Sequence, residues 1–125
     1  MMKLAYAICF ALGLGVGMTH AAGTDCQATS SKMLDHLDKH DYLGATANFN
    51  ERMKASLSAD RLAQLWQAKV QHPEVPDVRG PVQVGKVQGY DVVVTSLHHG
   101  QDQINTRVVC DADGKIGGFF VKSIR

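Results

Sequence analysis

Two pairs of histidines have the residue type and spacing that could bind a metal ion or carry a proton. His36 and His40 stand four positions apart in a helical segment, the spacing that places two imidazoles on one helix face. A zinc site needs at least a third ligand, which no sequence pattern around this pair supplies. His98 and His99 fall in a polar stretch near Asp102, where an imidazole acts as general base only beside a positioned partner. We predict exposed surface histidines at both places, and neither a metal nor another cofactor.

Two aspartates before a glycine resemble the start of a calcium loop. Asp111 and Asp113 are two positions apart, and Gly114 directly follows Asp113. The further carboxylates and the closing glutamate of such a loop are missing, because glycines and phenylalanines follow instead. Aspartate caps its own backbone in tight turns and glycine adopts positive φ there. The segment therefore predicts a hairpin turn.

The N-terminal segment has the three parts of an export signal. Lys3 supplies the positive charge, residues 4–18 are uncharged and mostly apolar, and small residues permit cleavage after Ala21 or Ala22. A membrane anchor needs about 20 apolar residues, and this run is shorter. We expect residues 1–21 to be a cleaved signal peptide. The protein is then exported from a bacterial cell, periplasmic or secreted, without a stable membrane anchor.

Removal of the signal peptide makes the charge balance neutral. Loss of Lys3 lowers the 13 basic side chains to 12, equal to the 12 acidic ones. Nucleic acids and anionic membrane surfaces are bound through a positive field, so neither is expected as a partner. The roughly 100 remaining residues predict a single domain over 26–122.

The same cleavage leaves an even number of cysteines. Cys9 lies in the signal peptide, so that Cys26 and Cys110 remain. Two cysteines in an oxidising compartment usually pair, and this pair would close most of the domain into one loop. A disulfide is favoured, and two separate buried thiols are the alternative.

The first half of the mature chain has helical periodicity. Residues 26–40 place apolar side chains on one stripe, a second short helix is expected over about 41–49, and a further turn or two over 51–55. The stripe consists of Cys26, Met33, Leu34 and Leu37.

The helix expected after Ser58 has the clearest start signal. Ser58 can accept the free N–H groups of a first turn, and Leu57 can pack against Leu62. Pro73 and Pro76 then end the helical segment.

The second half has the pattern of strands. Valines separated by glycines over 78–89 predict a bent or bulged strand, and 90–97 and 104–110 predict two further strands. A polar loop is expected at 98–103, and a last strand at 115–121. Helices followed by strands without alternation predict an α+β fold, with about three N-terminal helices on a four-stranded antiparallel sheet.

The strand half also resembles a known family. Residues 87–94 (VQGYDVVV) and 107–120 (RVVCDADGKIGGFF) are similar to the domain of unknown function 3887 family (DUF3887), and 26–122 fit its outline. That family resembles the nuclear-transport-factor-2-like (NTF2-like, cystatin-like) superfamily, which implies a curved sheet and a cone-shaped domain. Relatives often precede an α/β-hydrolase domain, but this sequence has no G-x-S-x-G motif, so no hydrolase activity is expected.

The resemblance implies a pocket between the sheet and the helices. Its lining candidates are the aromatic residues and the arginine that could face the cone: Tyr42, Phe49, Trp66, Tyr90 and Arg107. Asp91 beside Tyr90 is similar to the carboxylate and phenol of isomerase relatives. Neighbouring residues in a strand point to opposite faces, however, so these two cannot enter one pocket.

These observations favour a non-enzymatic binding module over an enzyme. It would use its sheet face or the cone to hold another protein, a second copy of the chain or a small apolar ligand. One alternative is an isomerase- or dehydratase-like enzyme that uses the cone. Another is an accessory domain acting in trans on a separate hydrolase. No catalytic residue is assigned.

Overall fold

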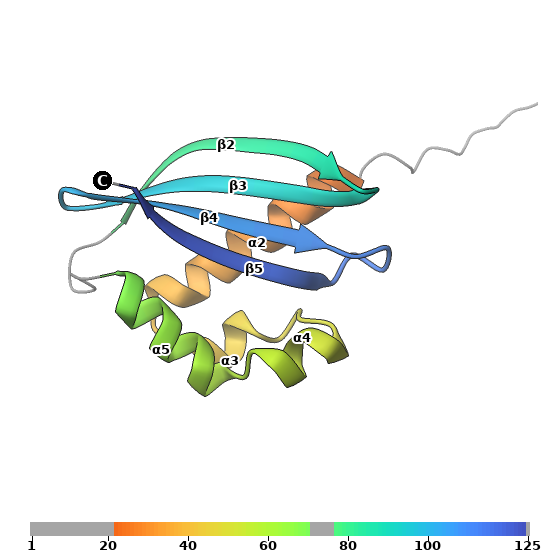
Figure 1. Cartoon of the computed structure of the whole chain (residues 1–125), viewed down its shortest axis with the longest axis horizontal. Coiled ribbons are helices and arrows are strands. Elements are labelled where there is room, and N and C mark those ends of the chain that lie inside the picture. The colour runs from red at the N-terminus through yellow and green to blue at the C-terminus, as the bar shows by residue number, and fades with distance from the viewer. Residues whose placement is uncertain (1–21, 71–76, 125) are drawn as a thin grey trace, which may run out of the picture.

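The computed structural model describes residues 22–70 and 77–124. Within this part, helices α2 (Ala22–Asp38), α3 (Tyr42–Ala45), α4 (Glu51–Ser56) and α5 (Ala59–Lys69) precede strands β2 (Asp77–Val87), β3 (Tyr90–His99), β4 (Asp102–Cys110) and β5 (Ile116–Ile124). The strands form one antiparallel sheet in the order β2-β3-β4-β5, and the helices pack on one side of it (Figure 1). The predicted α+β class is confirmed. The signal peptide and the two prolines that were expected to end the third helix lie outside the described residues.

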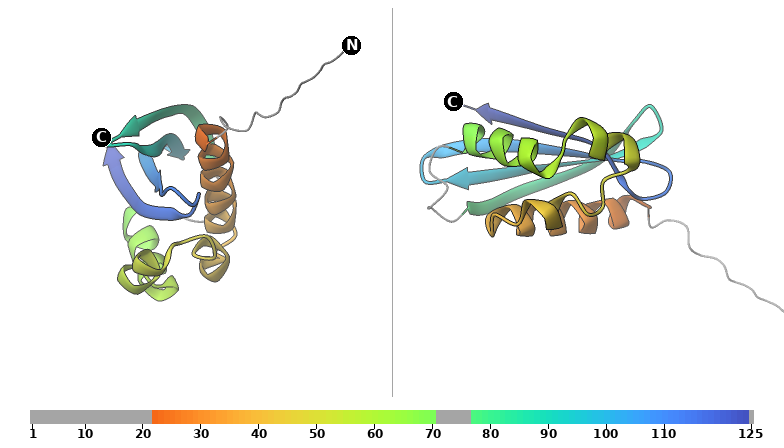
Figure 2. Two further views of the ribbon diagram at one scale, coloured as in Figure 1. Left: turned by 90° about the vertical axis from the view of Figure 1, so that its right-hand side faces the viewer. Right: turned by 90° about the horizontal axis from the view of Figure 1, so that it is seen from below.

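The longest helix is attached to the sheet by a disulfide bond. Cys26, in the second turn of α2, is bonded to Cys110 at the end of β4, with 5.9 Å between their Cα atoms. Met33, Leu34 and Leu37 continue the same stripe and are almost completely buried. Figure 2 shows α2 lying along the sheet. The disulfide that the sequence favoured is therefore present. None of the helices in residues 22–70 is long and apolar enough to cross a membrane.

The end of α2 differs from the prediction. The sequence predicted a helix to residue 40, but the helix ends at Asp38 and His40 has a φ of 59°. The N–H of Asp41 donates to the carbonyl of His36 at 2.8 Å, and that of His40 to Leu37 at 3.0 Å. These two bonds define a Schellman motif, which satisfies the last carbonyls of a helix with a residue in the left-handed region.

The start of α5 follows the predicted signal. Ser58 is extended, and its Oγ accepts a hydrogen bond from the N–H of Arg61 at 3.3 Å. This bond satisfies one of the N–H groups that a helix leaves free in its first turn. Leu62 and Trp66 are buried one turn apart, so the cap fixes which face of α5 meets the sheet.

The space between the sheet and the helices is filled by apolar side chains. Inward residues of β3, β4 and β5 meet those of the helices in one cluster. Its largest fully buried members are Trp66, Phe49, Leu34, Leu37, Leu62, Leu97, Ile104 and Ile116.

Strand β2 is bulged, as the glycine-rich pattern predicted. Its pairing with β3 shifts register between Arg79 and Val82, around Gly80 and Pro81. Proline donates no hydrogen bond, so an edge strand with a bulge is a position that tolerates it.

The turn between β3 and β4 is shorter than predicted. Residues 98–103 were expected to form a polar loop, but β3 continues to His99 and β4 begins at Asp102, its register partner. Only Gly100 and Gln101 remain between the strands, and Gly100 takes a φ of 63°. Glycine adopts this conformation without strain, so a two-residue turn is possible here. The polar residues on either side of it, which resemble loop residues by type, therefore continue the pairing of β3 with β4.

Candidate interaction surface

The sheet has one face that no described helix covers. Successive residues of a strand point to opposite faces, so the residues that alternate with the inward positions of β3, β4 and β5 point away from the helices. One of them, Val92, is only 5% exposed. The register aligns Val92 with Val109 and Gly118, and it aligns Val94 with Arg107 and Phe120. We call this surface the outer face, and its central residues are Tyr90, Val92, Val94, Arg107, Val109, Gly118, Phe120 and Lys122.

Large apolar side chains are exposed on the outer face. Tyr90 is 50% exposed and Phe120 is 56% exposed, and Val87, the register partner of Tyr90 on β2, is 46% exposed. Val93 and Val108, which point to the opposite face of the same sheet, are fully buried. Grouped apolar side chains on a soluble protein surface are typical of an interaction site.

A glycine lies beside the Phe120 ring on the sheet. A Cβ built on Gly118 would lie 3.3 Å from Cε2 of Phe120 and 3.4 Å from Cβ of Val109. The ring edge therefore lies next to the position where a side chain at 118 would stand, so a larger residue there would meet it.

The charged groups of the outer face are cations. Arg107 and Lys122 are exposed there, and neither makes an ion pair with a carboxylate among the described residues. The outward positions of β3, β4 and β5 include no aspartate or glutamate. The face therefore combines apolar rings with unpaired positive charge.

Two hollows border the outer face at the end where Tyr90 stands. One of about 250 Å³ is lined by Tyr90, Val109 and Gly117 of the sheet, by Asp111 of the β4–β5 turn, and by Asn50 and Arg52 at the start of α4. The other, of about 370 Å³, lies between the hairpin turns and the start of α2, and its lining includes Asp25, Asp91 and Asp113. In residues 22–70 and 77–124 no group of three or more His, Cys, Asp or Glu side chains could hold a metal ion.

The β4–β5 turn is joined to α4 by an amide and a carboxylate. Asn50 caps α4 by accepting from the N–H of Met53 at 2.8 Å, and its Nδ2 donates to Oδ2 of Asp111 at 3.0 Å. Oδ1 of Asp111 accepts from the N–H groups of Asp113 at 2.9 Å and Lys115 at 3.0 Å. Burial opposes ionisation of Asp111, but these hydrogen bonds outweigh it and lower the pKa of the carboxyl below 3.8.

Replacing Asp111 by alanine is expected to lower the free energy of unfolding at pH 7 by about 1–3 kcal/mol, because three donors lose their acceptor. A lowered folded-state pKa means that this contribution is present above the unfolded value and is lost as pH falls through the folded value. The difference between the wild type and Asp111→Ala should therefore shrink below about pH 4. Urea denaturation at pH 7 and pH 3 measures it. Asp113→Ala, in the same turn, is the matched control, and an equal loss from both variants would contradict the assignment.

The structure does not bring the five predicted pocket residues together. Phe49 and Trp66 are 1% exposed and belong to the core, and Tyr42 is half-buried against it. Tyr90 and Arg107 are on the outer face. Aromatic side chains at core spacing fill the space between the layers, whereas the register alone decides that Tyr90 and Arg107 face outward.

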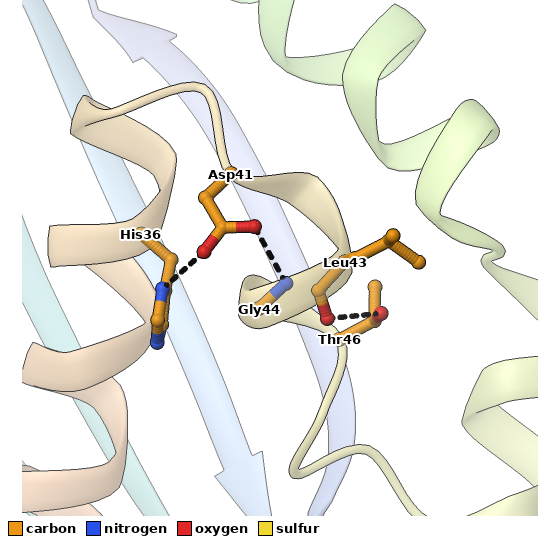
Figure 3. A network of polar contacts seen from close by, with 5 residues as sticks. All are labelled: His36, Asp41, Leu43, Gly44 and Thr46. Atoms are coloured by element: carbon orange, nitrogen blue, oxygen red, sulfur yellow. Dashed lines mark hydrogen bonds and ion pairs between the residues drawn. The ribbon is translucent and has the colours of Figure 1, made fainter.

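The histidine pair of the first helix does not share a helix face, because α2 ends at Asp38, before His40. His36 lies on α2, where its Nδ1 is 3.0 Å from Oδ2 of Asp41 (Figure 3). His40 lies beyond the end of α2 and stacks on Tyr42 with 6.3 Å between ring centroids. Oδ1 of Asp41 accepts from the N–H of Gly44 at 3.0 Å, and this bond, with a contribution from His36, lowers the pKa of Asp41 below its ordinary value. Both side chains reach the surface, with His36 41% exposed and His40 exposed, so the prediction of surface histidines is confirmed for this pair.

The second histidine pair corrects the prediction. His98 is exposed, as expected, but His99 is only 4% exposed and its ring meets Trp66 edge to face, with centroids 6.3 Å apart. The two were expected to be exposed loop residues. Because β3 extends through both, they alternate between the outer and the inner face.

The sequence favoured a binding module that uses a sheet face or the cone, but it did not identify the residues of the outer face. Their signal in the sequence is the alternation of apolar residues at 90, 92 and 94 beside the inward Val93 and Leu97, which makes β3 apolar on both faces. Such a strand is usually covered on both sides. No family model matches this chain, and no curated protein is significantly similar to it.

Proposed function

We propose that the chain is a non-enzymatic binding domain that holds a protein partner on the outer face. The observation that carries the proposal is the exposure of Phe120 beside Arg107, its register partner, which makes no ion pair among the described residues, with Tyr90 exposed further along the same face. Aromatic and arginine side chains are the residue types that contribute most to the affinity of protein interfaces. The sheet presents them on a rigid surface, so little conformational entropy is lost when a partner binds.

The interior supports binding at the surface over chemistry in a cone. An isomerase-like enzyme would need a ligand cavity between the sheet and the helices. The described side chains pack there into one apolar cluster, with Trp66 and Phe49 almost completely buried. The Asp91 carboxylate, next to Tyr90 in the sequence, pairs with Lys86 at 2.8 Å and is 11% exposed.

We further propose that the domain is exported and belongs with the DUF3887 and NTF2-like proteins that its strand half resembles. The disulfide between Cys26 and Cys110 supports an oxidising compartment, because cytosolic thiols are kept reduced. The signal sequence at 1–21 supports the same location. The order of helices and strands supports the family.

The proposal is tested by recovering the exported protein from periplasmic extract in three forms. These are the wild type, Phe120→Glu on the outer face and Lys54→Glu on the exposed side of α4. A partner that uses the outer face is expected to remain bound to the first and third forms and to be lost about tenfold or more from Phe120→Glu. Native mass measurement reports its stoichiometry. Equal recovery with all three forms, or a small molecule that stays bound to Phe120→Glu, would contradict the proposal.

A further inference from the structure

Arg107 occupies the middle of the outer face. It lies on the central strand β4, with Val94 as register partner on one side and Phe120 on the other. An arginine between apolar neighbours presents a planar, always charged fork that binds a carboxylate through two parallel hydrogen bonds. The low polarity of the neighbours strengthens such a pair once a partner excludes water.

Four of the 12 acidic side chains are held by partners outside the outer face. Asp35 and Asp38 contact Arg79 at the helix-covered side, at 3.0 and 2.9 Å. Asp91 contacts Lys86, and Asp111 accepts from Asn50 and the turn backbone. Arg107 and Lys122 therefore keep the outer face positive although the mature chain is neutral overall.

This charge pattern argues against a second copy of the chain as occupant. A symmetric dimer places the same patch on both subunits. Two outer faces would bring arginine and lysine toward arginine and lysine, with no carboxylate on the outward positions of β3, β4 and β5 to neutralise them. Nucleic acid fits poorly as well, because two cations supply few of the phosphate contacts on which its affinity depends.

We propose that the outer face recognises an acidic, apolar protein segment, with a carboxylate paired to Arg107 and an apolar side chain covering Phe120. This inference rests on the proposed function, since it specifies the chemistry of the partner at the same surface. The partner is a different protein. Its carboxylate that pairs with Arg107 and its apolar side chain that covers Phe120 lie next to each other, within one side-chain length.

The test is selection of peptides from a phage-displayed library of random 12-residue sequences against the folded protein. Selected peptides are expected to contain aspartate or glutamate next to large apolar residues. As synthetic peptides they should bind Arg107→Glu about tenfold or more weakly than the wild type, and Arg107→Lys with an intermediate loss. Raised salt should weaken binding to the wild type. Lys54→Glu should leave it unchanged.

The outcomes separate this inference from the proposed function. Peptides that lose binding to Phe120→Glu, yet lack carboxylates and bind Arg107→Glu normally, would overturn the acidic partner while leaving the surface in place. Selection that yields no peptide dependent on Phe120 would overturn both. A wild-type dimer in sedimentation equilibrium that Phe120→Glu dissociates would also overturn the inference. Circular dichroism of each variant confirms folding, because exposed substitutions change stability by only about 0.5 kcal/mol.

Discussion

Replacing Cys26 and Cys110 together with alanine is expected to lower the free energy of unfolding by about 4–5 kcal/mol, from the entropy of the closed loop. The two residues are 84 positions apart, so the bond closes about two thirds of the 125-residue chain into one loop in the unfolded state. Both are buried, at 1% and 2% exposure, so the reduced pair gains no contact with water in the folded state. Urea denaturation followed through Trp66, the only tryptophan, measures the difference.

The reduced wild type is the matched control for the double variant. Both lack the bond, so their unfolding curves should agree within the cost of replacing two thiols by methyl groups. Because the bond is buried, the folded protein should react slowly with reductant. Two free thiols in folded protein purified without reductant would contradict the bond. A double variant whose free energy of unfolding lies within about 1 kcal/mol of the oxidised wild type would contradict the predicted stabilising effect of the bond.

Local signals in the sequence predicted most of the fold. The stripe from Cys26 to Leu37 identified the first helix and its buried face, and Ser58 identified the start of α5. The Asp111–Gly114 segment identified the last turn. Each of these depends on neighbours within a few residues, and the physics of caps and turns is equally local.

The remaining differences arise where backbone conformation depends on a single residue or on distant packing. His40 adopts positive φ, which is uncommon for a residue other than glycine, so the helix end could not be read from the pattern. Gln88 does the same at the β2–β3 turn. His99 resembles a loop residue by type, and it is buried only because Trp66 of a distant helix meets it.

The candidate surface was predictable only in part. Tyr90 and Arg107 were identified as functional candidates, but for a pocket on the inner side. The alternation of a strand fixes which residues share a face, yet it does not say which face the helices cover. That choice depends on the register among β3, β4 and β5 and on the disulfide that holds α2 to the inner side.

Truncating Trp66 to alanine is expected to lower the free energy of unfolding by about 3–5 kcal/mol, the range for removing a buried aromatic side chain. The indole is 1% exposed and contacts both the core and the His99 ring, so its loss opens a cavity between α5 and the β3–β4 end of the sheet. Small domains are stable by only about 5–15 kcal/mol, and the variant should approach the limit of folding. Circular dichroism replaces fluorescence as the probe, since the only tryptophan is removed.

Two further variants separate packing from helix propensity. Trp66→Phe retains an aromatic ring against His99 and should lose less than half as much as Trp66→Ala, because most of the cavity is filled. Gln67→Ala, the exposed next residue of α5, should change stability by no more than about 0.5 kcal/mol. If Trp66→Ala cost no more than Gln67→Ala, the indole would not be a core residue. Because the disulfide acts mainly on the unfolded chain and the indole on the folded packing, removing both should be nearly additive and should leave the domain unfolded.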